Sequence, residues 1–228
     1  MAKRRLAVIR RLLPKNLTQR RTEPSIRGAE EIQGFSTPHL LDIGCAYGPF
    51  LAAAREEGFA PFGIDPAEDA VRYVTEILGI PAVQGFFTAH CSLLTAPYSV
   101  ITLWYVIEHF RDCVPVLAEI RKLLKPGGVL AFATPSFTGI SGRASLKKFL
   151  ERSPADHWTI WSPAVAKKVL KTAGFTVKKI VNSGHHPERF PVLGKYARSK
   201  KSPLYWLLLA ISKIFALGDT FEAYAARR

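Results

Sequence analysis

One short segment of the chain combines a carboxylate with two closely spaced glycines. It reads Asp42-Ile43-Gly44-Cys45-Ala46-Tyr47-Gly48, and a second acid, Asp65, follows 23 residues after Asp42. Glycine lets the backbone approach a ligand closely, and a carboxylate can accept hydrogen bonds from two neighbouring hydroxyls. The spacing therefore predicts a site for an adenosine-containing ligand, with Asp65 on its ribose.

The elements around these residues alternate between short apolar runs and amphipathic stretches, which is typical of βα units with a largely parallel sheet. The glycine segment then lies on a strand-to-helix turn at the carboxyl edge of the sheet, where open α/β folds bind ligands. Glycine or proline marks most of the helix ends. The sequence predicts strands over 39–43, 59–64, 81–84, 98–105, 129–134, 175–181 and 220–226, and helices over 49–57, 67–78, 112–124 and 163–173.

Two other interpretations of the glycine turn stay open at this point. It could be a tight connection in an unrelated α/β fold, although that would not explain Asp65. A nicotinamide dinucleotide fold also combines a glycine turn with a downstream acid, but this chain lacks the GxGxxG pattern. A cofactor with a sulfonium and an amino-acid tail suits the carboxylate of Asp42 better than a phosphate does.

Four segments, taken in order, carry a resemblance to a known family. They are LLDIGCAYG at 40–48, GIDP at 63–66, YSVITLWYVIEHFRD at 98–112 and LKPGGVLAFATP at 124–135. Over roughly residues 38–182 the chain resembles the class I S-adenosylmethionine-dependent methyltransferases, in particular the small-molecule group similar to ubiquinone-biosynthesis methyltransferases. The resemblance implies a Rossmann-like three-layer sandwich with a mainly parallel seven-stranded sheet whose last strand is antiparallel. It also implies methyl transfer from S-adenosylmethionine to a small or lipophilic acceptor.

The resemblance also implies which residues contact the cofactor. Two positions depart from the family pattern, because Ala46 stands where the middle glycine is usual and Phe86 where an acid often contacts adenine. Aromatic contact by Phe86 would then replace the polar one. The expected cofactor-binding residues are Asp42, Gly44, Cys45, Ala46, Gly48, Asp65, Phe86 and Trp104.

Two histidines are candidates for the chemistry. Methyl transfer mainly requires alignment of the acceptor and removal of a proton. His109 follows the fourth strand and is the first candidate base, with a role in tying down the loop as the alternative. His157 is the second candidate, on an acceptor-side segment, unless it only packs locally. No metal site is predicted, and a cofactor-binding module without turnover or a nicotinamide-linked oxidoreductase are the alternative functions.

The net charge of +14 lies mainly at the two ends of the chain. Residues 1–37 are predicted to be a basic N-terminal helical extension, and residues 38–228 a methyltransferase domain with an insertion at about 184–217. The N-terminal helix is amphipathic, and membrane-surface binding is one interpretation of it. The apolar stretch 203–217 is too short to cross a bilayer. It is expected to pack on the core or across a dimer, or else to contact an anionic membrane or a lipophilic acceptor.

Other partners and the compartment follow from composition. The basic residues come with no nucleic-acid-binding module, so nucleic acid is not expected as a partner. Three cysteines form neither a disulfide framework nor a metal motif, and no secretory signal is evident. The chain is therefore expected in the cytoplasm, with membrane association as an extension of that prediction. Its oligomeric state is left open.

Overall fold

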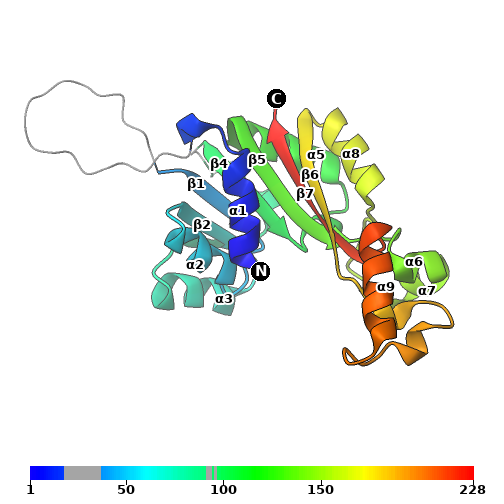
Figure 1. Ribbon diagram of the computed structural model, residues 1–228. Helices are drawn as coiled ribbons and strands as arrows, with labels where there is room; N and C mark the ends of the chain where they lie inside the picture. Colours follow the sequence, from blue (N-terminus) through cyan, green and yellow to red (C-terminus); the bar gives the residue numbers. More distant parts are fainter. Residues whose placement is uncertain (18–36, 91–93, 95–96) are drawn as a thin grey trace, which may run out of the picture.

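Seven strands form one sheet in the order β3-β2-β1-β4-β5-β7-β6 (Figure 1). The computed structural model describes residues 1–17, 37–90, 94 and 97–228. All neighbouring strands pair in parallel except β7, which is antiparallel to both β5 and β6. The predicted α/β fold with an antiparallel last strand is thus confirmed. The strands are β1 His39–Ile43, β2 Ala60–Asp65, β3 Ala82–Gln84, β4 Tyr98–Trp104, β5 Leu124–Pro135, β6 Phe175–Ser183 and β7 Thr220–Arg227.

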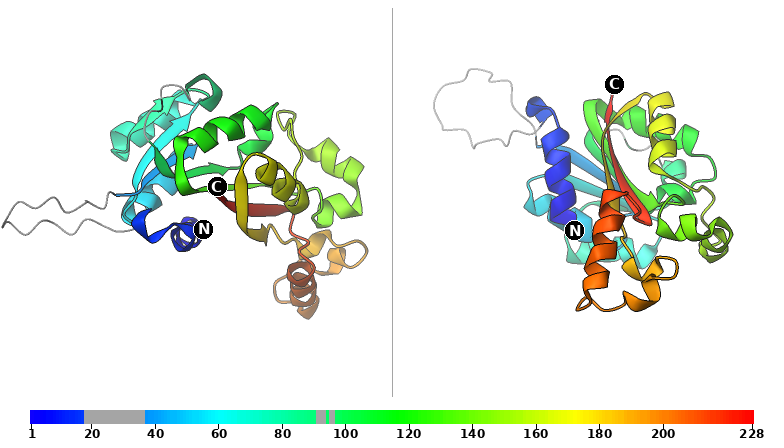
Figure 2. Two further views of the ribbon diagram at one scale, coloured as in Figure 1. Left: turned by 90° about the horizontal axis from the view of Figure 1, so that it is seen from above. Right: turned by 45° about the vertical axis from the view of Figure 1, so that its right-hand side comes forward.

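Helices cover both faces of this sheet and give the three layers. α1, α2 and the segment after α3 pack on one face, and α4, α5 and α8 pack on the other. Figure 2 shows α1 and α5 on opposite sides of the strands. The α-helices are α1 Ala2–Leu12, α2 Pro49–Glu56, α3 Glu68–Arg72, α4 Phe87–His90, α5 Cys113–Leu123, α6 Ile140–Ala144, α7 Leu146–Arg152, α8 Pro163–Thr172 and α9 Pro203–Ile214.

Side-chain caps explain why the long helices begin where the sequence predicts. Asp112 precedes α5 and accepts a hydrogen bond from the Val114 amide at 2.9 Å. Ser162 precedes α8 and accepts one from the Val165 amide at 3.2 Å. Each cap satisfies an amide that has no partner within the helix.

Two predicted elements differ in detail. The helix expected over 67–78 is an α-helix only to Arg72 and continues as a π-helical turn over Tyr73–Ile77. The segment 125–128, between the predicted helix 112–124 and the predicted strand 129–134, forms a bulge within β5. The pairing jumps from Leu124 opposite Tyr98 to Val129 opposite Val100, and Gly127 supplies the left-handed backbone (φ +74°).

The basic N-terminal helix predicted within residues 1–37 is α1, and it packs against α2 and β5. Leu6 and Ile9 are fully buried in the cluster that includes α2 and the sheet. Its apolar face is therefore covered by the protein and is not available to a membrane surface. Residues 18–36 of the predicted extension lie outside the described residues.

The insertion at 184–217 stands at one end of the sheet and carries α9 (Figure 2). Two short 3-10 turns, Pro187–Arg189 and Gly194–Tyr196, precede the helix and contact it. Within the described residues, no helix combines the length and apolar character needed to cross a bilayer.

Candidate functional site

The glycine turn after β1 has the shape that its residues predict. Gly44 adopts a left-handed conformation (φ +73°), and a Cβ at this position would lie 2.4 Å from Cγ2 of Val106. Ala46 is also left-handed (φ +47°), which costs a residue with a Cβ about 1–2 kcal/mol. This conformation gives a physical reason for the glycine that is usual at that position in the family the chain resembles.

Asp65 fixes the turn from the end of β2. One carboxylate oxygen accepts a hydrogen bond from the Ala46 amide at 2.8 Å, and the other accepts one from the Ala67 amide at 2.9 Å. A carboxylate offers about four lone-pair positions, so each oxygen keeps one for a ligand. Asp65 is only 8% exposed and lies at the wall of a large cavity.

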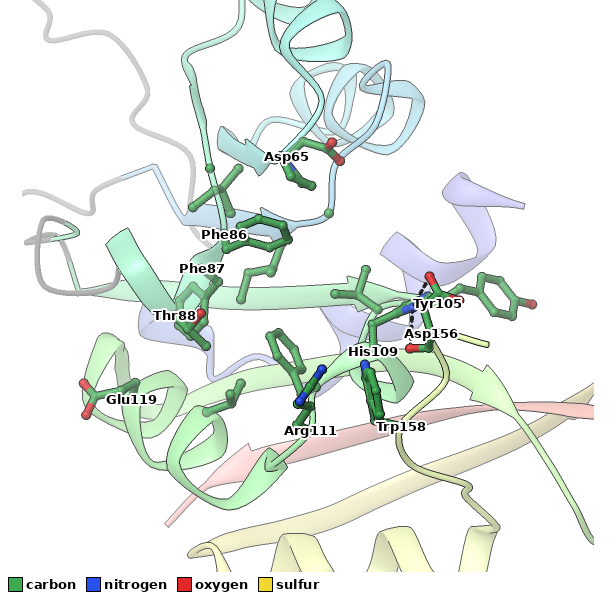
Figure 3. Close-up of a pocket in the computed structure, with 18 of the residues that line it drawn as sticks. Asp65, Phe86, Phe87, Thr88, Tyr105, His109, Arg111, Glu119, Asp156 and Trp158 are labelled. Carbon is green, nitrogen blue, oxygen red and sulfur yellow. Dashed lines mark hydrogen bonds and ion pairs between the residues drawn. The ribbon is translucent and has the colours of Figure 1, made fainter. Parts of the chain in front are cut away.

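This cavity, of about 1040 Å³, opens at the carboxyl ends of β1, β2 and β4. Ligand sites typically measure about 300–1,000 Å³, so the space is large enough for a nucleoside cofactor beside a second molecule. Figure 3 shows Asp65 and Phe86 on one side of it and His109, Asp156 and Trp158 on the other. We call it the first cavity. Of the predicted site residues, those that line it are Gly44, Ala46, Asp65, Phe86, Trp104 and His109.

Three other predicted cofactor residues, Asp42, Cys45 and Gly48, do not line the first cavity. Asp42 is 1% exposed, and its carboxylate accepts a 2.6 Å hydrogen bond from the Thr102 hydroxyl. Burial raises the pKa of Asp42 to about 8, although the Thr102 hydrogen bond and the charge of Arg5 both act to lower it. Cys45 is buried behind the turn, and Gly48 is the N-cap of α2.

An arginine of α1 lies over Trp104, a contact that no pattern in the sequence predicts. The Cζ of Arg5 lies 4.0 Å from the Trp104 ring centroid, and its Nε donates to Glu222 at 2.9 Å. Two buried donors here, Arg5 Nη2 and Trp104 Nε1, have no hydrogen-bond partner in the described part of the chain. Buried donors are normally paired, so the two fit a bound carboxylate, and of the two only Trp104 lines the first cavity.

His109 is held by the segment that follows α7. Its Nδ1 faces two acceptors of Asp156, a carboxylate oxygen at 3.1 Å and the carbonyl at 3.2 Å (Figure 3). Both acceptors require a proton on Nδ1, so a neutral ring presents the lone pair of Nε2. This segment is itself fixed, because the amide of Trp158 donates to the Glu108 carbonyl at 2.9 Å.

His157 lies behind His109 and not at the first cavity. Their ring centroids are 4.8 Å apart and the rings are perpendicular. Glu108 is 1% exposed, and burial raises its pKa, although the side chain of Thr134 acts to lower it. Donor atoms of Glu108, His109 and His157 lie within 4.8 Å of one another. Among the described residues these three could hold a metal ion, whereas the sequence predicted no metal site.

The arrangement fits an adenosine with an amino-acid tail. Asp65 retains acceptors for two ribose hydroxyls, and Phe86 supplies an exposed ring at the cavity wall. Arg5 and Trp104 supply unpaired donors for a carboxylate. These groups match the ribose, the adenine and the carboxylate of such a ligand.

Comparison with known proteins agrees with this arrangement. A family model described as a methyltransferase domain matches residues 1–180. The ubiquinone biosynthesis O-methyltransferase of Vibrio parahaemolyticus is 25% identical over 169 residues, which cover 69% of this chain and 72% of the relative.

Solved structures share the fold. A SAM dependent methyltransferase from Archaeoglobus fulgidus superposes with a TM-score of 0.62 at 20% identity, covering 84% of this chain and 86% of that chain. An S-adenosylmethionine dependent methyltransferase from Mesorhizobium loti superposes with a TM-score of 0.59 at 14% identity, covering 100% and 98% of the two chains.

Proposed function

This chain belongs to the methyltransferase domain family and is an S-adenosylmethionine-dependent methyltransferase, and we propose that its acceptor is a small, lipophilic molecule methylated on oxygen. The observation that supports this proposal is the first cavity. Asp65 lies on one side of it, and the other side is largely aromatic and ends at His109. The relatives named for ubiquinone biosynthesis support an oxygen acceptor. Nothing in the comparisons supports the nicotinamide-linked alternative.

The chain's own residues would bind the cofactor, orient the acceptor and remove the acceptor's proton. S-adenosylmethionine supplies an activated methyl group when bound. Asp65 would hold its ribose, and Arg5 with Trp104 would hold its carboxylate. His109, oriented by Asp156, would take the acceptor proton on Nε2, which is the arrangement of a base held by a carboxylate.

Binding and turnover test this function separately. Calorimetric titration should show binding of S-adenosylhomocysteine and no binding of NAD. Incubation with metabolite extracts and isotope-labelled donor should then give a product heavier by one methyl group. Binding without any methylated product would favour a cofactor-binding module, and binding of NAD in place of S-adenosylhomocysteine would overturn the proposal.

Replacing His109 should slow methyl transfer without weakening cofactor binding. General base catalysis contributes about 10²–10⁴-fold, and we expect His109→Gln to lower kcat about 100-fold on the acceptor found in the screen. The Kd of S-adenosylhomocysteine should stay within about twofold, because the ring lies on the acceptor side of the first cavity.

The control for this variant is His39→Gln, at the exposed start of β1, which should leave kcat unchanged. The donor group of Glu108, His109 and His157 makes a chelator an informative second control. If a metal acts here, EDTA will abolish turnover, whereas a base that works alone will be insensitive to it. Full activity of His109→Gln would remove the base assignment.

We also propose that the insertion makes peripheral contact with an anionic membrane surface, which would give access to a lipophilic acceptor. α9 leaves large apolar side chains in solvent, including Trp206 at 56% and Ile214 at 75% exposure. Aromatic and cationic residues together favour the interface of an anionic bilayer. The exposed cations around α9 are Lys195, Arg198, Lys200, Lys201 and Lys213.

The membrane contact predicts co-sedimentation with vesicles of phosphatidylglycerol and phosphatidylcholine. Trp206→Ser combined with Leu207→Ser should weaken it at least fivefold, because burial of each side chain contributes about 1.5–3 kcal/mol at full depth. Ile77→Ser with Val114→Ser, two exposed apolar residues elsewhere, should not. Binding should also weaken with salt. Equal sedimentation of both double variants would contradict the contact.

The free thiols Cys45 and Cys113 support the cytoplasmic side of that membrane as the location.

A further inference from the structure

A second cavity, of about 700 Å³, lies on the far side of His157 from the first cavity. Its walls come from α6, α7, the segment leading to His157, and the start of the insertion. His157 lines the second cavity and His109 lines the first. The two spaces are therefore separated by one pair of imidazole rings, whose centroids are 4.8 Å apart.

Two solvent-exposed cations at the wall of the second cavity have no ion-pair partner among the described residues. Lys148 and Arg152 lie one turn apart on α7, and both line the cavity. In the described part of the chain, neither side chain makes an ion pair or a hydrogen bond. Like charges four residues apart destabilise a helix, so their placement on one face favours a ligand that neutralises them.

The acids at the same wall are already paired within it. Asp219 is 6% exposed and accepts hydrogen bonds from the Ser141 amide at 2.8 Å and the Ser141 hydroxyl at 2.6 Å. It also accepts from Arg189 at 2.8 Å. Glu188 pairs with His186 at 2.9 Å. The acids of this wall are thus paired with other groups, and the exposed side chains of Lys148 and Arg152 stay available to an anion that enters the second cavity.

The remaining polar groups suit an oxyanion. Arg152 offers a planar fork of donors and Lys148 a compact charge, the two groups that proteins use for phosphate and carboxylate. Ser145 accepts from the Lys148 amide at 3.3 Å, which leaves its hydroxyl proton free to donate. These donors line one cavity together with the apolar residues Pro135, Ala144, Phe149 and Pro154, which leaves room for a ligand that carries both an anionic and an apolar part.

We propose that the second cavity binds an anionic group, a phosphate or a carboxylate, carried by the methyl acceptor. The inference rests on the proposed function, because it takes the first cavity as the place of methyl transfer. An acceptor anchored by Lys148 and Arg152 extends past His157, so that its reacting hydroxyl meets His109. The anchor determines which acceptors are held long enough to react.

The test is a titration of the full chain with inorganic phosphate and, in parallel, with acetate. Binding is measured through the chemical shifts of the backbone amides. Shifts should saturate in the millimolar range and concentrate at residues 145–153. Lys148→Gln with Arg152→Gln should raise the Kd at least fivefold. The matched control is Lys167→Gln with Lys168→Gln, which removes the same charge from exposed positions of α8 and should change the Kd less than twofold.

Each outcome of this titration supports or contradicts the anion site in the second cavity. Saturable binding of either anion at α7 that depends on Lys148 and Arg152 supports the site, and the tighter anion identifies the group. Shifts spread over the surface, or equal loss in both double variants, overturn it. S-adenosylhomocysteine is titrated into the same samples. If the wild-type chain does not bind S-adenosylhomocysteine, the proposed function is contradicted. If it binds S-adenosylhomocysteine but neither anion, only the second site is contradicted.

Discussion

Replacing Asp65 with alanine is expected to raise the Kd of S-adenosylhomocysteine more than a hundredfold. The variant would lose the two ribose contacts proposed for Asp65. It also loses the hydrogen bonds that Asp65 accepts from the Ala46 amide in the glycine turn and from the Ala67 amide at the start of α3. A hydrogen bond to a charged group contributes about 1.5–3 kcal/mol. Two lost ribose bonds therefore correspond to about 3–6 kcal/mol, and a hundredfold change in Kd is about 2.8 kcal/mol.

Isothermal calorimetry measures this effect, and two further variants locate its cause. Asp65→Asn keeps one carbonyl acceptor and should give an intermediate loss. Asp69→Ala removes a neighbouring carboxylate that bonds the Tyr47 hydroxyl outside the first cavity, and it should bind almost as the wild-type chain does. Unchanged affinity in folded Asp65→Ala would end the cofactor assignment at this site.

Local sequence patterns were sufficient for the fold. The helices begin at capping residues that the sequence shows, such as Asp112 and Ser162, and each strand is a short apolar run. The residues at the strand ends could be placed for the same reason, since parallel strands end at one edge of the sheet. Asp65 and Trp104 thus both line the first cavity, as their positions at the ends of β2 and β4 imply.

Contacts between distant segments could not be read from those patterns. Arg5 belongs to a basic helix whose amphipathic pattern suits either a membrane or a protein face, and only the assembled sheet brings it over Trp104. Small side chains make room for it, because Ala133 lies between Trp104 and Glu222 in the register of the strands. No spacing in the sequence encodes that row of residues.

The different positions of the two histidines also could not be predicted from the sequence. His109 was the first candidate base and His157 the second, and each stands beside an acid in the sequence. The backbone bonds from Trp158 and Thr159 to the Glu108 carbonyl turn Asp156 toward His109 and leave His157 behind it. One histidine therefore faces the first cavity and the other lines the second.

Asp42 should make the stability of the ligand-free protein depend on pH by several kcal/mol. Its pKa is raised by burial from an ordinary value of 3.8 to about 8, so between these values the folded chain binds more protons than the unfolded chain. Stability then falls as pH rises from about 4 to about 8, and levels off above that. The slope approaches about 1.4 kcal/mol per pH unit for this one group.

The difference in unfolding free energy between the wild-type chain and Asp42→Asn isolates that group from all other titrations. Urea unfolding at several pH values should show the wild-type chain losing about 3 kcal/mol relative to the variant between roughly pH 5.5 and pH 8. Thr102→Val removes the hydrogen bond that lowers the Asp42 pKa, so it should move the upper end of this range to higher pH. A difference that does not change with pH would mean that Asp42 is ionised throughout. Arg5 would then compensate its charge, and the face of the sheet beneath α1 would carry a buried ion pair before any cofactor arrives.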